Sequence, residues 1–155
     1  MNATYRPMRT DDLPAAFAVR LSTVENAMTL ERLESDYGIT PQSLARAMKS
    51  DVKGWLCEEA GQVVGFAMGD LSKGEVGVVA VLPGHEGRGI GRNLLTLVQN
   101  WLFSESFDEI WLLADPDPSL RAHGFYRKLG WQPTGEFSKG NEVLKRRKAG
   151  PDHPD

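Results

Sequence analysis

The stretch GHEGRGIGR, residues 84–92, places a glycine at every second position from Gly87 to Gly91. It follows the valine-rich run 76–81 and precedes a segment with helical periodicity. Glycines let a backbone approach a ligand closely, and the first amide N–H groups of a helix lack partners and attract anions. The pattern therefore predicts a main-chain site for a phosphate or diphosphate at residues 86–92. A tight strand-to-helix turn without a ligand is the alternative interpretation.

Two familiar phosphate-binding loops do not fit this stretch. A P-loop ends in Gly-Lys followed by Ser or Thr, whereas Arg92 and Asn93 follow Gly91 here. A Rossmann loop lies in an early β-α-β unit, whereas this loop comes after a run of short strands. The loop is therefore expected to belong to another class of anion site.

The elements around the loop predict an α/β domain. Strands are expected over 4–8, 55–57, 63–68, 76–81, 108–114 and 142–146, and helices over 13–22, 41–49, the segment after the loop and 119–129. Asp12, Thr40 and Ser119 stand at positions typical of helix caps. The segment 24–37 gives no clear pattern.

Composition limits the classes of function. The chain has 155 residues, of which 41% are hydrophobic, and we expect one domain over 1–148 with a disordered tail at 149–155. A net charge of -3 argues against nucleic acid as a partner. The single Cys57 excludes an internal disulfide, and no cluster has metal-ligand spacing. Without an export signal or a long apolar run, we expect a cytoplasmic protein that does not enter membranes.

Two segments carry a resemblance to a known family. Residues 79–95, VAVLPGHEGRGIGRNLL, resemble the acetyl-coenzyme A (acetyl-CoA) binding motif of the GNAT superfamily of N-acetyltransferases, Gln/Arg-x-x-Gly-x-Gly/Ala after a strand ending in Val-x-Pro. Residues 122–131, AHGFYRKLGW, look like the later motif of that family. The resemblance covers Tyr5 to about Arg146. It implies an α/β fold with a GNAT-type mixed central β-sheet flanked by helices on both faces.

The resemblance implies acetyl-CoA as cosubstrate and assigns residues to it. The diphosphate is expected at Glu86, Gly87, Arg88, Gly89, Ile90, Gly91 and Arg92, and the pantetheine arm at Val79, Ala80 and Val81, where the strand should bulge and splay from its neighbour. Glu86 departs from the Gln or Arg of the family, and we expect Arg88 and Arg92 to offset its charge. Ser119 stands where the family often has an asparagine near the pantetheine arm.

Acetyl transfer to an amine poses two proton problems, because the amine must lose a proton and the leaving thiolate must gain one. Tyr126 stands where the resemblance places the acid. Glu75 begins the strand before the loop, and an even offset predicts that it shares a face with Val79 and Val81. It is the candidate base, with Glu25 and a water chain as alternatives.

The sequence thus predicts an enzyme that moves an acetyl group from acetyl-CoA to a primary amine by direct attack in a ternary complex. The acceptor is expected to be an amine-bearing small molecule or the amine of a peptide or protein, bound near residues 24–37. A coenzyme A sensor without turnover is the alternative suggested by Glu86 and the missing asparagine, and a plain interaction domain is a third. A monomer and a homodimer both remain open.

Overall fold

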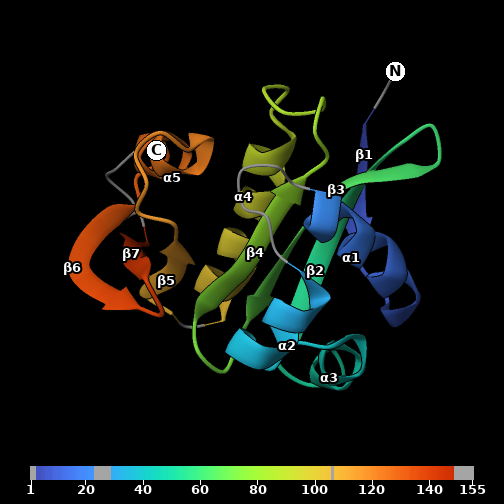
Figure 1. Ribbon diagram of the computed structural model, residues 1–155, viewed down its shortest axis with the longest axis horizontal. Helices are drawn as coiled ribbons and strands as arrows, with labels where there is room; N and C mark the ends of the chain where they lie inside the picture. Colours follow the sequence, from blue (N-terminus) through green and yellow to red (C-terminus); the bar gives the residue numbers. More distant parts are fainter. Residues whose placement is uncertain (1–2, 23–28, 106, 149–155) are drawn as a thin grey trace.

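The computed structural model describes residues 3–22, 29–105 and 107–148. Its strands form one seven-stranded sheet in the order β1-β2-β3-β4-β5-β7-β6 (Figure 1). The strands are β1 (Thr4–Pro7), β2 (Val52–Glu59), β3 (Gln62–Asp70), β4 (Glu75–Val81), β5 (Glu109–Ala114), β6 (Gln132–Ser138) and β7 (Asn141–Arg147). The helices are the 3-10 helix η1 (Thr10–Asp12), α1 (Leu13–Ser22), α2 (Leu30–Tyr37), α3 (Pro41–Ala47), α4 (Ile90–Ser104) and α5 (Arg121–Lys128). Among the strands of the described residues, only β4 and β5 pair in parallel, so the sheet is mixed.

Local capping chemistry explains where the first helices begin. The Asp12 carboxylate accepts a hydrogen bond from the Arg9 amide at 2.8 Å, just before α1. At α3, the Thr40 hydroxyl accepts from the Ser43 amide at 3.0 Å and the Ser43 hydroxyl accepts from the Thr40 amide at 2.8 Å. Such a reciprocal cap satisfies amide donors that the helix itself leaves unpaired. The helix predicted over 13–22 is confirmed, and the one predicted over 41–49 forms with a shorter end.

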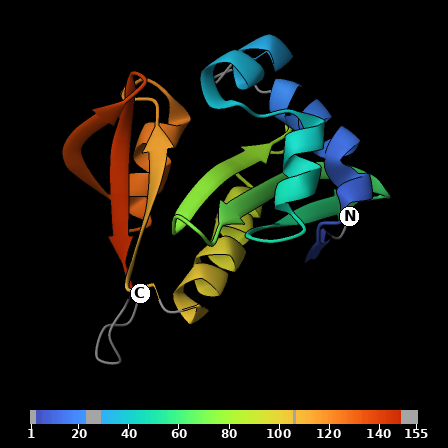
Figure 2. The same cartoon turned by 90° about the horizontal axis from the view of Figure 1, so that it is seen from below.

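The two faces of the sheet carry separate helical layers (Figure 2). On one face, α4 buries an apolar stripe against β3, β4 and β5, and α5 packs beside it. On the other face, α1 buries Leu13, Ala16 and Phe17 against Leu56 and Phe66 of the sheet, and α2 adds a further leucine. Each fully buried leucine contributes about 1.5–3 kcal/mol to folding. The predicted mixed sheet with helices on both faces is confirmed.

The centre of the sheet is irregular at β4. Its register with β3 pairs Val78 with Met68 but Val76 with Gly69, so Gly77 is an extra residue in a β-bulge. Its parallel pairing with β5 covers only Glu75 and Val76. Beyond these residues the two strands diverge (Figure 2). The expected splay is therefore present, whereas the bulge lies at Gly77, before the 79–81 segment where it was expected.

Three sequence-based expectations about elements were wrong or incomplete. Residues 30–37 form α2, which begins after Thr29, whose hydroxyl accepts from the Arg32 amide at 3.1 Å. β6 was not predicted, because it is exposed along its whole length at the sheet edge and has no alternating pattern. Ser119 does not cap α5, since its hydroxyl donates to Asp117 Oδ1 at 2.8 Å and the helix starts at Arg121.

Other expectations concern membranes, metals and the chain end. Among the described residues, no helix has the length and apolar character needed to cross a bilayer. The same residues contain no group of three or more His, Cys, Asp or Glu side chains arranged to hold a metal ion. Cys57 is fully buried in strand β2. The tail predicted to be disordered, 149–155, lies outside the described residues.

Candidate active site

The glycine loop joins β4 to the start of α4 with several residues in the left-handed region. Gly84, Gly87 and Gly89 have φ values of 88°, 80° and 83°, which L-residues with a side chain adopt only under strain. Gly89 occupies the cap position of α4 and provides no side chain to satisfy the first helical amides.

The amides of this loop are available to a ligand. The His85 amide donates to Leu82 O at 3.0 Å, and the Asn93 amide donates to Gly89 O at 3.0 Å. Between them, no described residue accepts a hydrogen bond from the amides of residues 86–92. Unpaired amides at a helix N-terminus form an anion site, so the loop fits the diphosphate of coenzyme A.

The charges around the loop differ from the expected arrangement. The Arg88 guanidinium donates two hydrogen bonds to the buried carboxylate of Glu59 at the end of β2, one of them at 3.1 Å. Arg88 is therefore paired with Glu59. The expectation was that Arg88 would instead offset the charge of Glu86. Arg121, at the start of α5, lies 3.9 Å from the Glu86 carboxylate instead. Arg92 is exposed in the first turn of α4.

A small cavity of about 70 Å³ occupies the gap between the diverging strands. Its lining comprises Arg20, Val76, Gly77, Val78, Val79, Leu112, Leu113 and Tyr126. Tyr126 comes from α5, and its ring contacts that of the buried Trp131, with the ring centroids 6.2 Å apart. The Trp131 indole donates to Gln99 on α4 at 3.0 Å, which joins the segment after α5 to α4. The structure thus brings Tyr126 to the strand that was predicted to hold the pantetheine arm.

Burial governs the acidity of Tyr126. Loss of solvent raises the pKa of Tyr126 to about 12, while the nearby Arg20 cation acts in the opposite direction. The phenol is therefore protonated throughout the neutral range. It is chemically able to donate a proton or a hydrogen bond into the small cavity.

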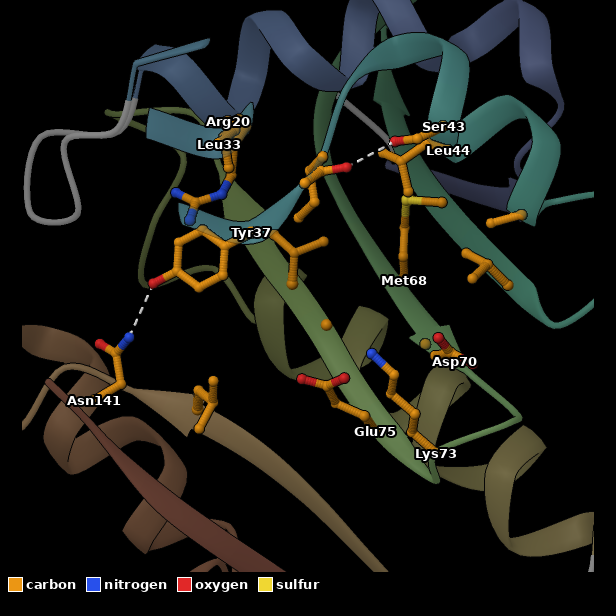
Figure 3. Close-up of a pocket in the computed structure, with 18 of the residues that line it drawn as sticks. Arg20, Leu33, Tyr37, Ser43, Leu44, Met68, Asp70, Lys73, Glu75 and Asn141 are labelled. Carbon is orange, nitrogen blue, oxygen red and sulfur yellow. Dashed lines mark hydrogen bonds between the residues drawn. The ribbon is translucent and has the colours of Figure 1, made fainter. Parts of the chain in front are cut away.

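A larger cavity of about 830 Å³ lies between the sheet and helices α1, α2 and α3 (Figure 3). The turn between β6 and β7 closes one side of the cavity. There the side-chain amide of Asn141 donates to the Tyr37 hydroxyl at 3.0 Å. Lys139 lies 4.9 Å from the centroid of the Tyr37 ring. The cavity has the size of a small-molecule site, and it shares Arg20, Gly77, Val78 and Leu113 with the small cavity. An acceptor bound in the large cavity therefore lies next to the gap that Tyr126 faces.

Glu75 lies in the large cavity, near Lys73 and Asp70 (Figure 3). Desolvation raises the pKa of Glu75, Lys73 opposes the shift, and Asp70 adds to it. The expectation that Glu75 shares a face with Val79 and Val81 was wrong, because the bulge at Gly77 reverses the alternation of side chains. Glu75 instead faces the α1 side of the sheet, whereas Val79 and Val81 pack on the α4 side.

The remaining predicted residues are distributed around these cavities. Val79 lines the small cavity, and Ala80 is buried against the α1 side of the sheet. Ser119 lies before α5, outside both cavities, and is bonded to Asp117. Glu25, the alternative base, lies outside the described residues.

Sequence reasoning missed several residues that the fold brings to the site. Arg20 lines both cavities, Glu59 holds the loop through Arg88, and Tyr37 pairs with Asn141 across the large cavity. For Arg20 a signal was available, since it follows the buried Ala16 by four residues and thus shares its side of α1. Glu59 and Tyr37 gave no local signal, because their partners are distant in the sequence.

Comparisons with known proteins identify the family and the fold. A model of the acetyltransferase (GNAT) family matches residues 21–131, more than half of the chain. No curated protein sequence matches. Among solved structures, PaiA N-acetyltransferase of Thermoplasma acidophilum in complex with coenzyme A has a TM-score of 0.77 at 15% identity, covering 96% of this chain and 100% of that one.

Two further structures are similar to this chain over nearly their full lengths. Ard1 of Thermoplasma volcanium has a TM-score of 0.74 at 18% identity and covers 97% of this chain and 100% of its own. The ribosomal-protein-S18-alanine N-acetyltransferase of Escherichia coli has a TM-score of 0.70 at 18% identity, with coverage of 99% and 100%. At these identities the structures establish the fold, and the family model establishes the family. The chain therefore belongs to the GNAT family of acetyl-CoA-dependent N-acetyltransferases.

Proposed function

We propose that the protein transfers an acetyl group from acetyl-CoA to a primary amine by direct attack, with both substrates bound at once. The observation that carries the proposal is the junction of the two cavities, where a roomy acceptor site meets the gap between β4 and β5 beside Tyr126. The amides of residues 86–92 bind the diphosphate, and the main chain of residues 79–81 pairs with the pantetheine arm. Bound acetyl-CoA supplies an acetyl group already activated as a thioester.

Two side chains transfer protons in this proposal. Glu75 accepts a proton from the acceptor ammonium, because an amine with a pKa near 10.4 is protonated at neutral pH and its lone pair must be freed. Tyr126 donates a proton to the departing sulfur. An unpaired N–H of β4 in the splayed region stabilises negative charge on the acetyl oxygen, as a fixed dipole in a dry site does.

Release of free thiol from acetyl-CoA on adding amines tests the proposal. The panel should contain amino acids, polyamines, an aminoglycoside, lysine peptides and peptides with a free N-terminal alanine, the last because a similar structure is an S18-alanine N-acetyltransferase. We expect amine-dependent thiol release with at least one class. A sensor would instead show thermal stabilisation by acetyl-CoA and no thiol release with any amine.

Substituting Glu59 with glutamine should weaken acetyl-CoA binding. Glu59 is 7% exposed and ties the loop to β2 through Arg88, and a charge-assisted hydrogen bond of this kind contributes about 1.5–3 kcal/mol. We expect the dissociation constant for acetyl-CoA, measured by calorimetry, to rise about tenfold. The exposed Glu136→Gln on β6 is the matched control. Equal affinities in both variants would show that the Glu59–Arg88 pair does not position the loop.

Substituting Glu75 with glutamine should remove the increase of kcat/KM with pH. Because burial raises the pKa of Glu75 above its ordinary value, its carboxylate forms only as the pH rises through that raised value. The wild-type kcat/KM should therefore increase with pH in this range, and the variant should lack this limb and be about tenfold slower at neutral pH. Asp115→Asn, in the same cavity, should keep the limb. If kcat/KM of the Glu75→Gln variant still increases with pH in this range, another group is the base.

A further inference from the structure

Arg20 occupies an unusual place for a charged side chain. It extends from the last turn of α1 and lines both the acceptor cavity and the small cavity between β4 and β5 (Figure 3). Burial lowers the pKa of its guanidinium, a group that nevertheless stays charged in proteins. A partly desolvated cation thus lies at the point where the two substrate sites meet.

The residues that line the small cavity indicate which group the Arg20 cation acts on. Apart from Arg20 and Tyr126, its lining consists of valine, leucine and glycine residues of β4 and β5. Arg20 and Tyr126 interact electrostatically across this buried gap, and Arg20 also interacts with Tyr37 of α2. A small buried gap holds little water and screens charge poorly, so the cation exerts a stronger field on the phenol than it would in bulk water.

We propose that Arg20 is a positioning residue that makes the Tyr126 hydroxyl a better proton donor to the leaving group. This inference rests on the proposed function, and it goes beyond it by giving the acid an electrostatic partner from α1. In a buried gap without a nearby cation, a phenol would resist losing its proton, because the phenolate would have no compensating charge. The guanidinium supplies that charge at the moment the proton moves.

The proposed step balances as follows. The amine nitrogen forms a bond to the acetyl carbon, the carbon–sulfur bond of the thioester breaks, and its electron pair goes to sulfur. The Tyr126 proton moves to that sulfur, which leaves as the thiol of coenzyme A. The attacking nitrogen, which has already given its ammonium proton to Glu75, loses a second proton to water as the amide forms. The phenolate next to Arg20 recovers a proton from that water.

The same location suggests a second role, recognition of a carboxylate on the acceptor. The two roles predict different kinetics. A residue that assists Tyr126 changes kcat, whereas a residue that binds the acceptor in its ground state changes the acceptor KM. The composition of the small cavity favours the first role.

A matched pair of variants tests the proposal: Arg20→Met removes the charge and keeps the length, and Arg20→Lys keeps the charge. We expect Arg20→Met to lower kcat about 10- to 30-fold, with KM for both substrates within about threefold of wild type, and Arg20→Lys to recover most of the rate. Thermal melts and acetyl-CoA affinity establish that each variant is folded. An unchanged kcat, or a change confined to the acceptor KM, would overturn the proposal.

A spectroscopic measurement makes the test independent of turnover. Protein labelled with fluorotyrosine, whose phenol is more acidic, is titrated by fluorine NMR, and the Tyr126 signal is assigned from its loss in Tyr126→Phe. We expect the apparent pKa of this signal to rise by about one unit in Arg20→Met and to stay near the wild-type value in Arg20→Lys. An equal value in all three proteins would overturn the inference. If no amine supports thiol release, the proposed function fails, and this titration still decides whether Arg20 acts on Tyr126.

Discussion

Replacing Tyr126 with phenylalanine should lower kcat by about 100- to 1,000-fold, within the range typical of a lost general acid. The substitution removes one hydroxyl from the small cavity and keeps the ring, which packs against Phe125 and Trp131. The affinity for acetyl-CoA should change by less than about twofold, since the loop amides that we propose to hold the diphosphate lie elsewhere. Steady-state thiol release and calorimetry with acetyl-CoA measure the two quantities.

Tyr5→Phe is the matched control for this prediction. The substitution removes the hydrogen bond that the Tyr5 hydroxyl accepts from Asn93 at 3.0 Å and the contact of that hydroxyl with the Cys57 thiol, and Tyr5 lines neither cavity. We expect it to keep the wild-type rate. If Tyr126→Phe also keeps that rate, another group or water protonates the sulfur, and the role given to Tyr126 is wrong.

Replacing Gly89 with valine should weaken acetyl-CoA binding by about 100-fold, the equivalent of one or two lost charge-assisted hydrogen bonds. Gly89 has a φ of 83° at the cap of α4, and a β-branched residue is strongly disfavoured there. Relief of that strain rotates the backbone and moves the amides of residues 86–92 away from a common centre. Calorimetry with acetyl-CoA measures the loss.

Gly135→Val separates backbone strain from loss of the site. Gly135 has a φ of 84° in the exposed strand β6, and a side chain there meets open space, as it does at Gly89. Both variants should lose similar thermal stability, but only Gly89→Val should lose affinity. Matched affinities would mean that the loop geometry does not determine binding.

The parts of the fold that the sequence predicted are those with local causes. Thr40 before Pro41 marked the start of α3, and the apolar stripe after the glycine loop marked α4. α2 escaped prediction because only Leu33 of its residues is buried, so its apolar pattern is weak. β6 escaped because pairing with β7 at the sheet edge, rather than burial of one face, holds it in place.

The residues of the candidate site also divide into those with a local sequence pattern and those that depend on distant segments. The glycine pattern of 84–92 and the motif around Tyr126 are local, and the structure brings both to the splayed end of β4. The side of the sheet on which Glu75 lies depends on the bulge at Gly77. The bulge arises from the register of β4 with β3, so the sequence of β4 alone does not predict it. The contacts of Glu59 with Arg88 and of Tyr37 with Asn141 join distant segments, and no local pattern encodes them.

The central claim is that the backbone amides of residues 86–92 bind the diphosphate of acetyl-CoA. Amide NMR spectra of nitrogen-15-labelled protein, titrated in parallel with acetyl-CoA and with S-acetylpantetheine, which lacks the diphosphate, test it most directly. We predict that acetyl-CoA produces large shifts in the amide signals of residues 86–92, and that S-acetylpantetheine leaves them in place while shifting those of residues 79–81. Equal responses of the loop to both compounds, or no response to acetyl-CoA, would contradict the account.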